Sequence, residues 1–298
     1  MFRTVYVSAG AAITVVDNWL LIKNSQGEEN KIPVADIYTL LLENVHTRIS
    51  VYALQYLSRR GVNIVCCDDK YMPACNVIPF IEHYRPYGVL KKQLALTAEF
   101  KALIWQRIVK AKILNQYYAA ASAGVDSRVT ERLQQLAEEV LPGDIGNREA
   151  IAAKMFFRSL YGCDFTRFAD DVLNYAMNYG YTIIRSAVAR SLIAYGYNCV
   201  LGVHHINENN AFNLADDFME PFRPIVDEWV QAHNDELVDE LSKQNKLALV
   251  NLLNVEVNWN NKIMKLHNAI DKYIASFTTA IDKADINKLL IPKLSKNG

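Results

Sequence analysis

The first 80 residues alternate short apolar runs with turn-forming residues. The runs are rich in β-branched and aromatic side chains, and they lie at 3–9, 11–17, 19–24, 31–34, 37–41 and 62–69. This pattern is typical of β-strands joined by tight turns. One helix is expected at 51–60, since Ser50 can cap its first turn and Gly61 can end it. One helix among six or more strands predicts a small β-sandwich-like domain over residues 1–82.

Beyond a stretch with proline and glycine at 83–90, apolar positions recur with the 3.6-residue period of a helix almost to the end of the chain. Residues 83–90 are therefore expected to link the β domain to a larger all-α domain over 91–298. The expected helical segments are 89–123 (one helix or two), 130–140, 148–160, 170–196 and 246–281 (one or two more), with an acidic amphipathic segment at 225–245. The predicted fold class is α+β with two domains.

Two local features of the helical half leave alternatives open. Either Asp144 or Asn147 can cap the helix at 148–160, whose first turn holds Glu149. A carboxylate there is favoured by the helix dipole, so helix stability is sufficient to explain Glu149 taken alone. Gly180 either breaks the helix at 170–196 or permits another element to pack closely against it.

Composition indicates an ordinary globular protein with a large core, because 51% of the 298 residues are hydrophobic and 21% are charged. The 32 basic and 32 acidic residues balance, so any nucleic-acid partner must meet a local patch. One candidate patch lies between residues 85 and 115, where seven basic residues accompany a single acidic one, Glu99. They are Arg85, Lys91, Lys92, Lys101, Arg107, Lys110 and Lys112. A solvated helix face is the simpler explanation, and a surface that follows DNA phosphates is the alternative.

The cysteines indicate a reduced, cytoplasmic protein. There are five, and the odd number, the lack of CxxC spacing and the lack of a secretory leader argue against a disulfide framework. No apolar run approaches the roughly 18 residues needed to cross a bilayer, so no membrane association is expected.

Candidate chemistry is concentrated in residues 201–224, LGVHHINENNAFNLADDFMEPFRP. A glycine turn leads into the pair His204–His205, and a polar loop then precedes an acidic amphipathic segment. On a helix, Asp216 or Asp217 can share a face with Glu220. A histidine beside such a face, with a third ligand from elsewhere in the chain, makes a workable divalent-metal site.

This set of donors favours one class of metal chemistry. One imidazole with carboxylates suits Mg2+ or Mn2+ and is too poor in nitrogen and sulfur for structural zinc. Such an ion would polarise a phosphoryl oxygen and help to position an oxygen nucleophile. The sequence contains no Walker A loop and no HExxH, GxSxG or GxGxxG motif, so it gives no support to chemistry that depends on those motifs.

Four segments together resemble one known family. They are RRGVNIVCCDD at 59–69, GNREAIAAKMFFRSLYG at 146–162, the segment 170–205 that ends in GVHH, and DDFMEPFRPIVD at 216–227. Over nearly its whole length the chain is similar to the CRISPR adaptation integrases, the CRISPR-associated protein numbered one, in the form found in type II systems.

The resemblance implies roles for individual residues. The acidic residue of the G-x-x-E segment, the second histidine of GVHH and the acidic residue before PFRP would be the catalytic metal ligands. In this chain they are Glu149, His205 and Glu220. Many relatives carry aspartate at or near the last position. Asp217 matches a second family carboxylate, as an outer or an alternative ligand of Mg2+ or Mn2+.

The resemblance also implies a fold, partners and a reaction. An N-terminal β domain would form a homodimer, and a helical domain would hold the site. The partners would be double-stranded DNA, as fragment and as repeat array, and a small ferredoxin-like protein, the CRISPR-associated protein numbered two, in a four-to-two complex; other type II CRISPR proteins are further candidates. Each 3′-OH of a captured fragment would attack a phosphodiester of the repeat in a metal-assisted transesterification.

Binding to duplex DNA requires basic side chains at its phosphates, so this neutral chain is expected to concentrate them on one face of the helical domain. The candidates are Arg148, Lys154, Arg167, Arg223 and part of the run at 85–115, with Arg59 and Arg60 in the β domain. For the last two, a solvated pair at a helix end is the simpler explanation.

Two other functions stay open from the sequence. A non-catalytic DNA-binding scaffold would leave the histidine and the carboxylates scattered in space. A stand-alone nuclease acting on branched DNA would cut repeat DNA without joining a fragment to it.

Overall fold

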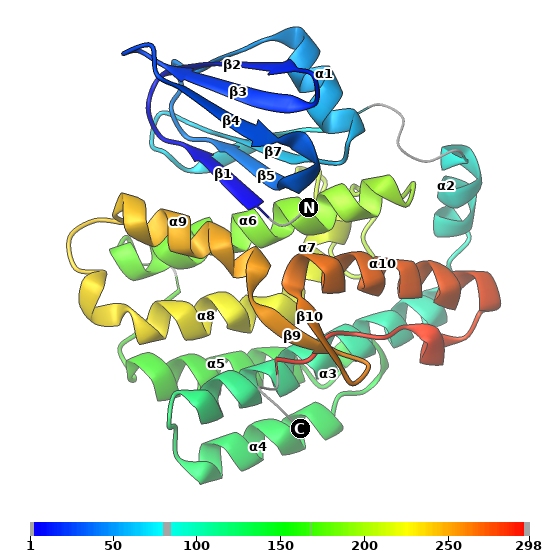
Figure 1. The fold of residues 1–298 in the computed structure, drawn as a ribbon. Helices are drawn as coiled ribbons and strands as arrows, with labels where there is room; N and C mark the ends of the chain where they lie inside the picture. The colour runs from blue at the N-terminus through cyan, green and yellow to red at the C-terminus, as the bar shows by residue number, and fades with distance from the viewer. Residues whose placement is uncertain (1–2, 80–84, 168, 295–298) are drawn as a thin grey trace. The chain divides into compact units, whose positions relative to one another are not determined.

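The computed structural model describes residues 3–79, 85–167 and 169–294 and divides the chain into two compact units, Met1–Tyr84 and Arg85–Gly298 (Figure 1). The first unit is rich in strands and the second is mainly helical, which confirms the predicted α+β class. The expected linker at 83–90 differs from the structure. Residues 83 and 84 lie outside the described residues, and helix α2 already begins at Pro86 (Pro86–Leu94). Proline is well suited to a first helical turn, where its missing amide hydrogen would have no partner in any case.

The first unit contains two four-stranded sheets. One has the order β1-β5-β7-β8 and the other the order β4-β3-β2-β6. The strands are β1 (Arg3–Val7), β2 (Ala11–Val16), β3 (Trp19–Asn24), β4 (Glu29–Pro33), β5 (Ile37–Leu42), β6 (Arg48–Ile49), β7 (Asn63–Cys67) and β8 (Pro73–Val77), and the helix is α1 (Val51–Arg59). As expected, Ser50 caps α1, with its hydroxyl oxygen 3.1 Å from the amide nitrogen of Ala53.

A single apolar core joins the two sheets. Val5 and Ile64 from one sheet belong to the same buried cluster as Ile13 and Leu20 from the other, and Leu57 of α1 joins them. In β1 and β2 the inward side chains come from alternate positions, whereas all six residues of β5, an inner strand of its sheet, are buried. The first unit is therefore the sandwich-like domain that its apolar runs indicate.

The second unit is a set of helices with one β-hairpin. Its helices are α2 (Pro86–Leu94), α3 (Ala98–Ser122), α4 (Ser127–Glu138), α5 (Arg148–Tyr161), α6 (Val172–Ala194), α7 (Asn213–Met219), α8 (Arg223–Ala232), α9 (Lys243–Asn251) and α10 (Leu266–Lys283), and the hairpin pairs β9 (Glu256–Trp259) with β10 (Lys262–Lys265). The short 3-10 helix η3 (Glu220–Phe222) joins α7 to α8.

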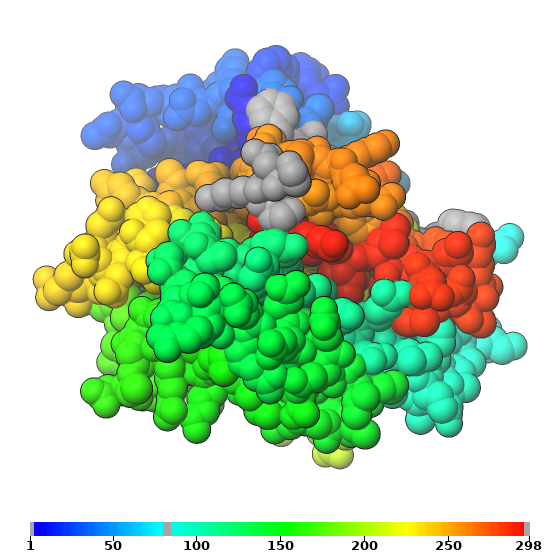
Figure 2. Space-filling view, turned by 90° about the horizontal axis from the view of Figure 1, so that it is seen from below, coloured from blue at the N-terminus to red at the C-terminus, as the bar shows by residue number. Residues whose placement is uncertain are grey.

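The long helix α3 is the element to which the functional site is attached. It packs against α4, α5, η3 and α8, and the face it forms with α4 and α5 is visible in blue-green and green in Figure 2. The predicted segment 89–123 is thus two helices, because Thr97 interrupts it and caps α3 through its hydroxyl oxygen, 3.2 Å from the amide nitrogen of Phe100.

Of the two alternatives for 246–281, the structure has two helices, α9 and α10, but residues 256–265 between them form the hairpin β9–β10, which the sequence did not predict. Asn260 and Asn261, at its turn, have φ angles of 47° and 63°. Asparagine tolerates this left-handed conformation well, and two such residues in succession make the tight turn that matches the twist of a two-stranded ribbon.

Gly180 lies inside an unbroken α6, so the close-packing alternative is the one realised. A Cβ at this position would lie 2.6 Å from a methyl carbon of Val226 in α8 and 3.2 Å from one of Leu249 in α9. The absence of a side chain therefore lets α8 and α9 approach α6.

A search of the described residues for a helix both long enough and apolar enough to span a bilayer finds none.

Candidate metal centre

Glu149 lies in the first turn of α5 and is held there by a side-chain cap. Asp144 accepts the amide hydrogens of Arg148 and Glu149 at N–O distances of 2.9 and 3.0 Å. Asn147 makes no such bond, and its backbone is left-handed with φ of 48°. Of the two candidate caps, Asp144 is therefore the one that fixes the start of α5.

His205 lies on the loop between α6 and α7, and Asp217 anchors that loop. Asp217 is fully buried in α7, and its carboxylate accepts the amide hydrogens of Val203, His204 and His205 at 2.7, 3.0 and 3.1 Å. Its Oδ1 also lies 2.6 Å from Nδ1 of the His205 ring. Because Asp217 binds Nδ1, the nitrogen of His205 that this carboxylate leaves to other partners is Nε2.

The ring of Trp105, from α3, supports both histidines of this loop. The His204 ring stacks on it with centroids 4.0 Å apart, and the His205 ring meets it edge to face at 5.7 Å. Trp105 is itself buried, with 1% of its surface exposed. The loop therefore rests on the core of the helical unit, which restricts the orientation of the His205 ring.

Asp217 also controls the charge of His205. The hydrogen bond to Asp217 raises the pKa of His205, against the opposing effect of burial, and the charges of Asp217, Glu220 and Asp216 raise it further. The pair stabilises the fold fully below the unfolded pKa of about 6.5, and that contribution is lost as pH rises through the higher folded pKa.

Replacing Asp217 by asparagine is expected to lower the pKa of His205, because the largest cause of its elevation is removed. In the unmodified protein the free energy of unfolding falls above about pH 6.5, as His205 loses its proton. Most of that fall should be absent from the variant. Titration of the His205 ring by NMR and urea unfolding at several pH values measure both effects. Asp216→Asn is the matched control, since Asp216 lies next to Asp217 and contributes least to the shift; an unchanged His205 pKa in Asp217→Asn would contradict the assignment.

Glu220 is a buried carboxylate in η3, with 3% of its surface exposed. Its Oε1 lies 2.8 Å from Nε of Arg223, and its Oε2 lies 2.5 Å from Nζ of Lys112. Burial alone would raise the pKa of Glu220, but the charges of Arg223 and Lys112 outweigh it and lower the pKa well below its usual range. Glu220 is therefore ionised at neutral pH, with a cation on each oxygen.

Lys112 joins Glu220 to Glu149. Its Nζ lies 2.6 Å from Oε1 of Glu149, and its side chain is 11% exposed. Burial lowers the pKa of Lys112, whereas the charges of Glu220 and Glu149 raise it by more, so the amine is a charged ammonium. Two carboxylates from separate elements thus meet on one buried positive charge.

The structure brings two of the three predicted ligands together. Glu149 and Glu220 share Lys112, and the charge of Glu220 acts on His205. With the side chains as they stand, no three His, Cys, Asp or Glu groups among the described residues are arranged to enclose an ion. The ammonium of Lys112 occupies the space between the two glutamates.

Three of the predicted DNA-binding arginines are engaged within the protein. Arg148 pairs with Glu139 at 2.8 Å, and Arg223 pairs with Glu220. Arg167 donates hydrogen bonds to two asparagines of α6, one of them Asn178 at 3.0 Å. These contacts hold the arginines in fixed orientations, and they offset part of the charge that each would present to a phosphate.

The other basic candidates differ in exposure. Lys154, Arg59 and Arg60 are exposed, and the guanidinium of Arg60 lies over the ring of Tyr56 at 4.8 Å. In the run at 85–115, Lys110 is exposed as the solvated-face explanation requires, whereas Lys112 is buried at the candidate metal centre.

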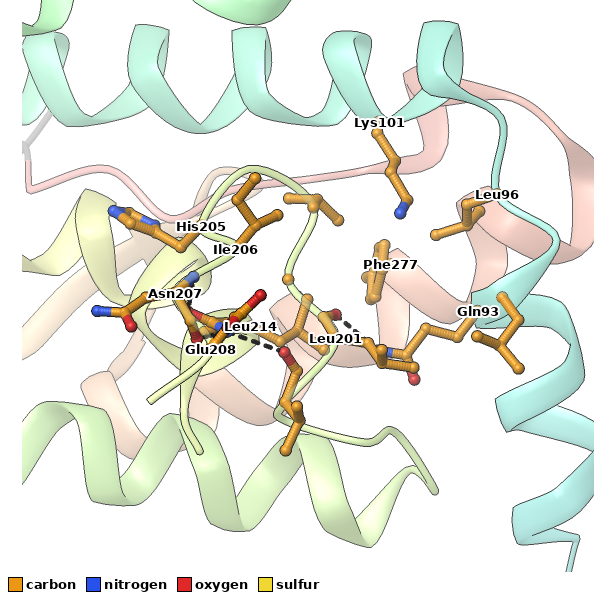
Figure 3. Close-up of a pocket in the computed structure, with 15 residues that line it drawn as sticks. Gln93, Leu96, Lys101, Leu201, His205, Ile206, Asn207, Glu208, Leu214 and Phe277 are labelled. Carbon is orange, nitrogen blue, oxygen red and sulfur yellow. Dashed lines mark hydrogen bonds between the residues drawn. The ribbon is translucent and has the colours of Figure 1, made fainter. Parts of the chain in front are cut away.

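His205 also borders a pocket of about 330 Å³ (Figure 3). In Figure 3 the side chain of Lys101 reaches toward this pocket from α3, Phe277 of α10 lies behind it, and the ring of His205 points away from its interior. Gln93 closes one side with a hydrogen bond of 2.9 Å from its amide to the carbonyl oxygen of Leu201. A second pocket of about 200 Å³ lies beside Arg223 and is also lined by Arg185.

Sequence reasoning did not single out two residues that organise the centre. Lys112 was one of seven basic residues in a run, and only the packing of α3 against α5 and η3 turns it toward the carboxylates. Trp105 supports the histidine loop from α3 without any recognisable motif. An apolar face of α3 that carries a lysine in phase with its core positions was the available signal for Lys112.

Comparisons with known proteins indicate the family to which this chain belongs. The family described as CRISPR associated protein Cas1 matches residues 5–246. The CRISPR-associated endonuclease Cas1 of Neisseria meningitidis serogroup C (strain 8013) is 36% identical over 295 residues, which cover 98% of this chain and 96% of that protein.

Solved structures share the fold at low sequence identity. A casposase bound to integration product has a TM-score of 0.74 at 16% identity, covering 96% of this chain and 93% of that one. A Cas1 protein from Thermotoga maritima has a TM-score of 0.73 at 14% identity, covering 94% and 97%. A chain of a Cas6-RT-Cas1–Cas2 complex has a TM-score of 0.71 at 18% identity. The match covers 99% of this chain and 36% of that longer one. With the family match and the near full-length relative, this chain belongs to the Cas1 family of CRISPR-associated endonucleases.

Proposed function

We propose that this protein is an integrase of CRISPR adaptation that joins short DNA fragments to a repeat array, using Mg2+ or Mn2+ held by Glu149, His205 and Glu220. The observation that carries the proposal is the meeting of Glu149 and Glu220 on one buried ammonium, that of Lys112. The ammonium of Lys112 lies between the carboxylates of Glu149 and Glu220, at a place where their negative charges favour a cation. With the imidazole of His205 nearby, the donors are the oxygen-rich set that suits Mg2+ or Mn2+.

The residues would divide the work as follows. His205 would offer Nε2, because its Nδ1 is bonded to Asp217. Both oxygens of Asp217 already accept amide hydrogens, so we assign Asp217 to orienting His205 and not to binding the ion directly. When bound, Mg2+ or Mn2+ would act as a Lewis acid on a phosphoryl oxygen and stabilise the charge that develops there.

The reaction is a transesterification. The 3′ oxygen of the fragment forms a bond to the phosphorus of a repeat phosphodiester while the bond from that phosphorus to the repeat's own 3′ oxygen breaks. One bond to phosphorus forms as another breaks, so the number of phosphodiester bonds is unchanged. The attacking hydroxyl loses a proton, and the leaving oxygen gains one. The protein's part is to align the 3′ end of the fragment with the repeat phosphodiester beside Glu149 and Glu220, so that the two reacting groups meet in one orientation.

The partners that we propose are those that membership of the family implies. Because one structural neighbour is a chain of a Cas6-RT-Cas1–Cas2 complex and another is a casposase bound to integration product, we propose double-stranded DNA and a Cas2-type protein as partners, in a four-to-two complex. We also propose that the unit Met1–Tyr84 forms the homodimer, that exposed Lys154, Arg59 and Arg60 contribute to DNA contacts, and that the protein works in the cytoplasm.

A joining assay tests the proposal. The full-length protein and its Cas2-type partner are incubated with a labelled duplex fragment and repeat DNA, with Mg2+ or Mn2+, and the products are resolved by size. We expect the label to appear in repeat DNA only with the divalent ion present, and EDTA to abolish the product.

The outcomes separate three functions. Cutting of repeat DNA without transfer of the label would support a stand-alone nuclease and overturn the integrase. DNA binding with neither cutting nor joining would support the scaffold. Joining that persists undiminished in EDTA would overturn the role of the metal.

A further inference from the structure

Lys112 is placed unusually for a lysine on a long helix. Its ammonium is buried between two carboxylates of other elements, at 2.6 Å from Glu149 and 2.5 Å from Glu220. Lysine is rarely buried this deeply unless its charge is paired. Here both partners are proposed ligands of the divalent ion, so the ammonium and that ion compete for the same carboxylate oxygens.

The contacts of the two basic residues at this site are not equivalent. Arg223 binds Oε1 of Glu220 and also lies over the ring of Tyr181, with its central carbon 4.5 Å from the ring centroid. Among the described residues, the ammonium of Lys112 donates a hydrogen bond to Glu149 and has ion pairs only with Glu149 and Glu220. A flexible four-carbon stem carries that ammonium, so it can leave while Arg223 stays in place.

We propose that Lys112 is a built-in competitor of the divalent ion: its ammonium neutralises Glu149 and Glu220 in the metal-free protein and is displaced when the ion binds. This inference rests on the proposed function, because it assumes that these two glutamates are ligands. It gives Lys112 two effects. It prevents two carboxylates from facing each other uncompensated, and it weakens metal binding by the free energy needed to break two ion pairs.

The test is a direct measurement of Mn2+ binding to the full-length protein without DNA, by titration calorimetry or by the electron paramagnetic resonance signal of free Mn2+. Lys112→Met removes the charge and keeps an unbranched side chain that is one atom shorter. We expect it to bind Mn2+ at least about tenfold more tightly than the unmodified protein, since no ammonium has to leave. Lys112→Arg, which keeps the charge, should not gain affinity.

Lys110→Met is the matched control. Lys110 lies on the same helix and is exposed, so this variant loses one positive charge away from the two glutamates and should bind Mn2+ nearly as the unmodified protein does. An equal gain in Lys110→Met and Lys112→Met would show a general charge effect and overturn the inference.

Stability provides a second measurement that does not depend on activity. Without metal, Lys112→Met should melt at a lower temperature than the unmodified protein, because Glu149 and the buried Glu220 lose the cation that they share, and Mn2+ should raise its melting temperature by more. If Lys112→Met is too unstable to titrate, Lys112→Gln, which can still donate hydrogen bonds to both carboxylates, serves in the same measurements.

The result can be told apart from a failure of the proposed function. Loss of Mn2+ binding in Glu149→Gln, with no tightening in Lys112→Met, would overturn the role of Lys112 and leave the metal centre intact. Unchanged Mn2+ binding in Glu149→Gln would instead overturn the metal centre itself.

Discussion

Glutamine in place of Glu149 is expected to reduce fragment joining by about a thousandfold or more, because loss of a metal ligand removes several kcal/mol of transition-state stabilisation. The amide keeps the shape of the side chain but not its charge. Glu149 is 25% exposed and lies at the start of α5, whose cap is made by Asp144, so the fold should tolerate the change.

The measurement is the joining rate at saturating Mg2+ or Mn2+, together with DNA affinity and melting temperature. DNA affinity should stay nearly unchanged, since the phosphates are held by basic side chains elsewhere. Glu131→Gln, which alters an exposed carboxylate on α4, is the matched control and should join fragments normally. Full joining activity in Glu149→Gln would remove the basis of the proposed mechanism.

Glu149 is a better position for this test than Glu220. Glu220 is 3% exposed and pairs with both Arg223 and Lys112, so its neutralisation weakens two ion pairs inside the protein. Removing one member of a buried pair typically costs about 3–5 kcal/mol of stability. A loss of activity in Glu220→Gln would therefore mix chemistry with unfolding.

Alanine in place of Gly202 is expected to displace the histidine loop and to reduce joining by about a hundredfold, through the misplacement of a catalytic side chain. A Cβ at position 202 would lie 2.2 Å from the carbonyl oxygen of His205 and 3.0 Å from Oδ2 of Asp217. The first of these atoms belongs to the backbone and cannot rotate away. The loop must therefore open, and the three hydrogen bonds from its backbone amides to Asp217 must break.

The effect is measured as the joining rate and as the loss of the raised His205 pKa in an NMR titration. Gly88→Ala is the control, because a Cβ there would meet nothing closer than 3.9 Å and alanine favours a helix more than glycine does. Normal joining and an unchanged His205 pKa in Gly202→Ala would show that the loop can adapt, contrary to this expectation.

Periodicity predicted most of the fold because each unit buries a regular face. Alternating apolar runs became the two sheets of the first unit, and 3.6-residue patterns became α3 to α6. The hairpin at 256–265 escaped because four-residue strands carry too few repeats to distinguish a period of 2 from one of 3.6. Its turn residues, Asn260-Asn261, were the only local signal, and they lie within a stretch that otherwise reads as helix.

The candidate site was predictable in part. The Gly-Val-His-His turn and the acidic segment before Pro221 lie within one short stretch of the sequence, and the structure joins them through the hydrogen bond between His205 and Asp217. Spacing could not decide whether Asp144 or Asn147 caps α5, since both residue types make such bonds and the choice depends on the backbone angles of the turn.

The sequence by itself determined which residues are candidates for the chemistry and most of the elements that present them, because side-chain type and local period are properties of short stretches of chain. Only the tertiary structure decided that Lys112 lies between Glu149 and Glu220. Helix α3 must pack against α5 and η3 at one particular rotation to bring that ammonium to both carboxylates. The free energy that selects this rotation comes from burying the apolar side chains around Lys112 in the same core, and a pattern of residue types does not contain it.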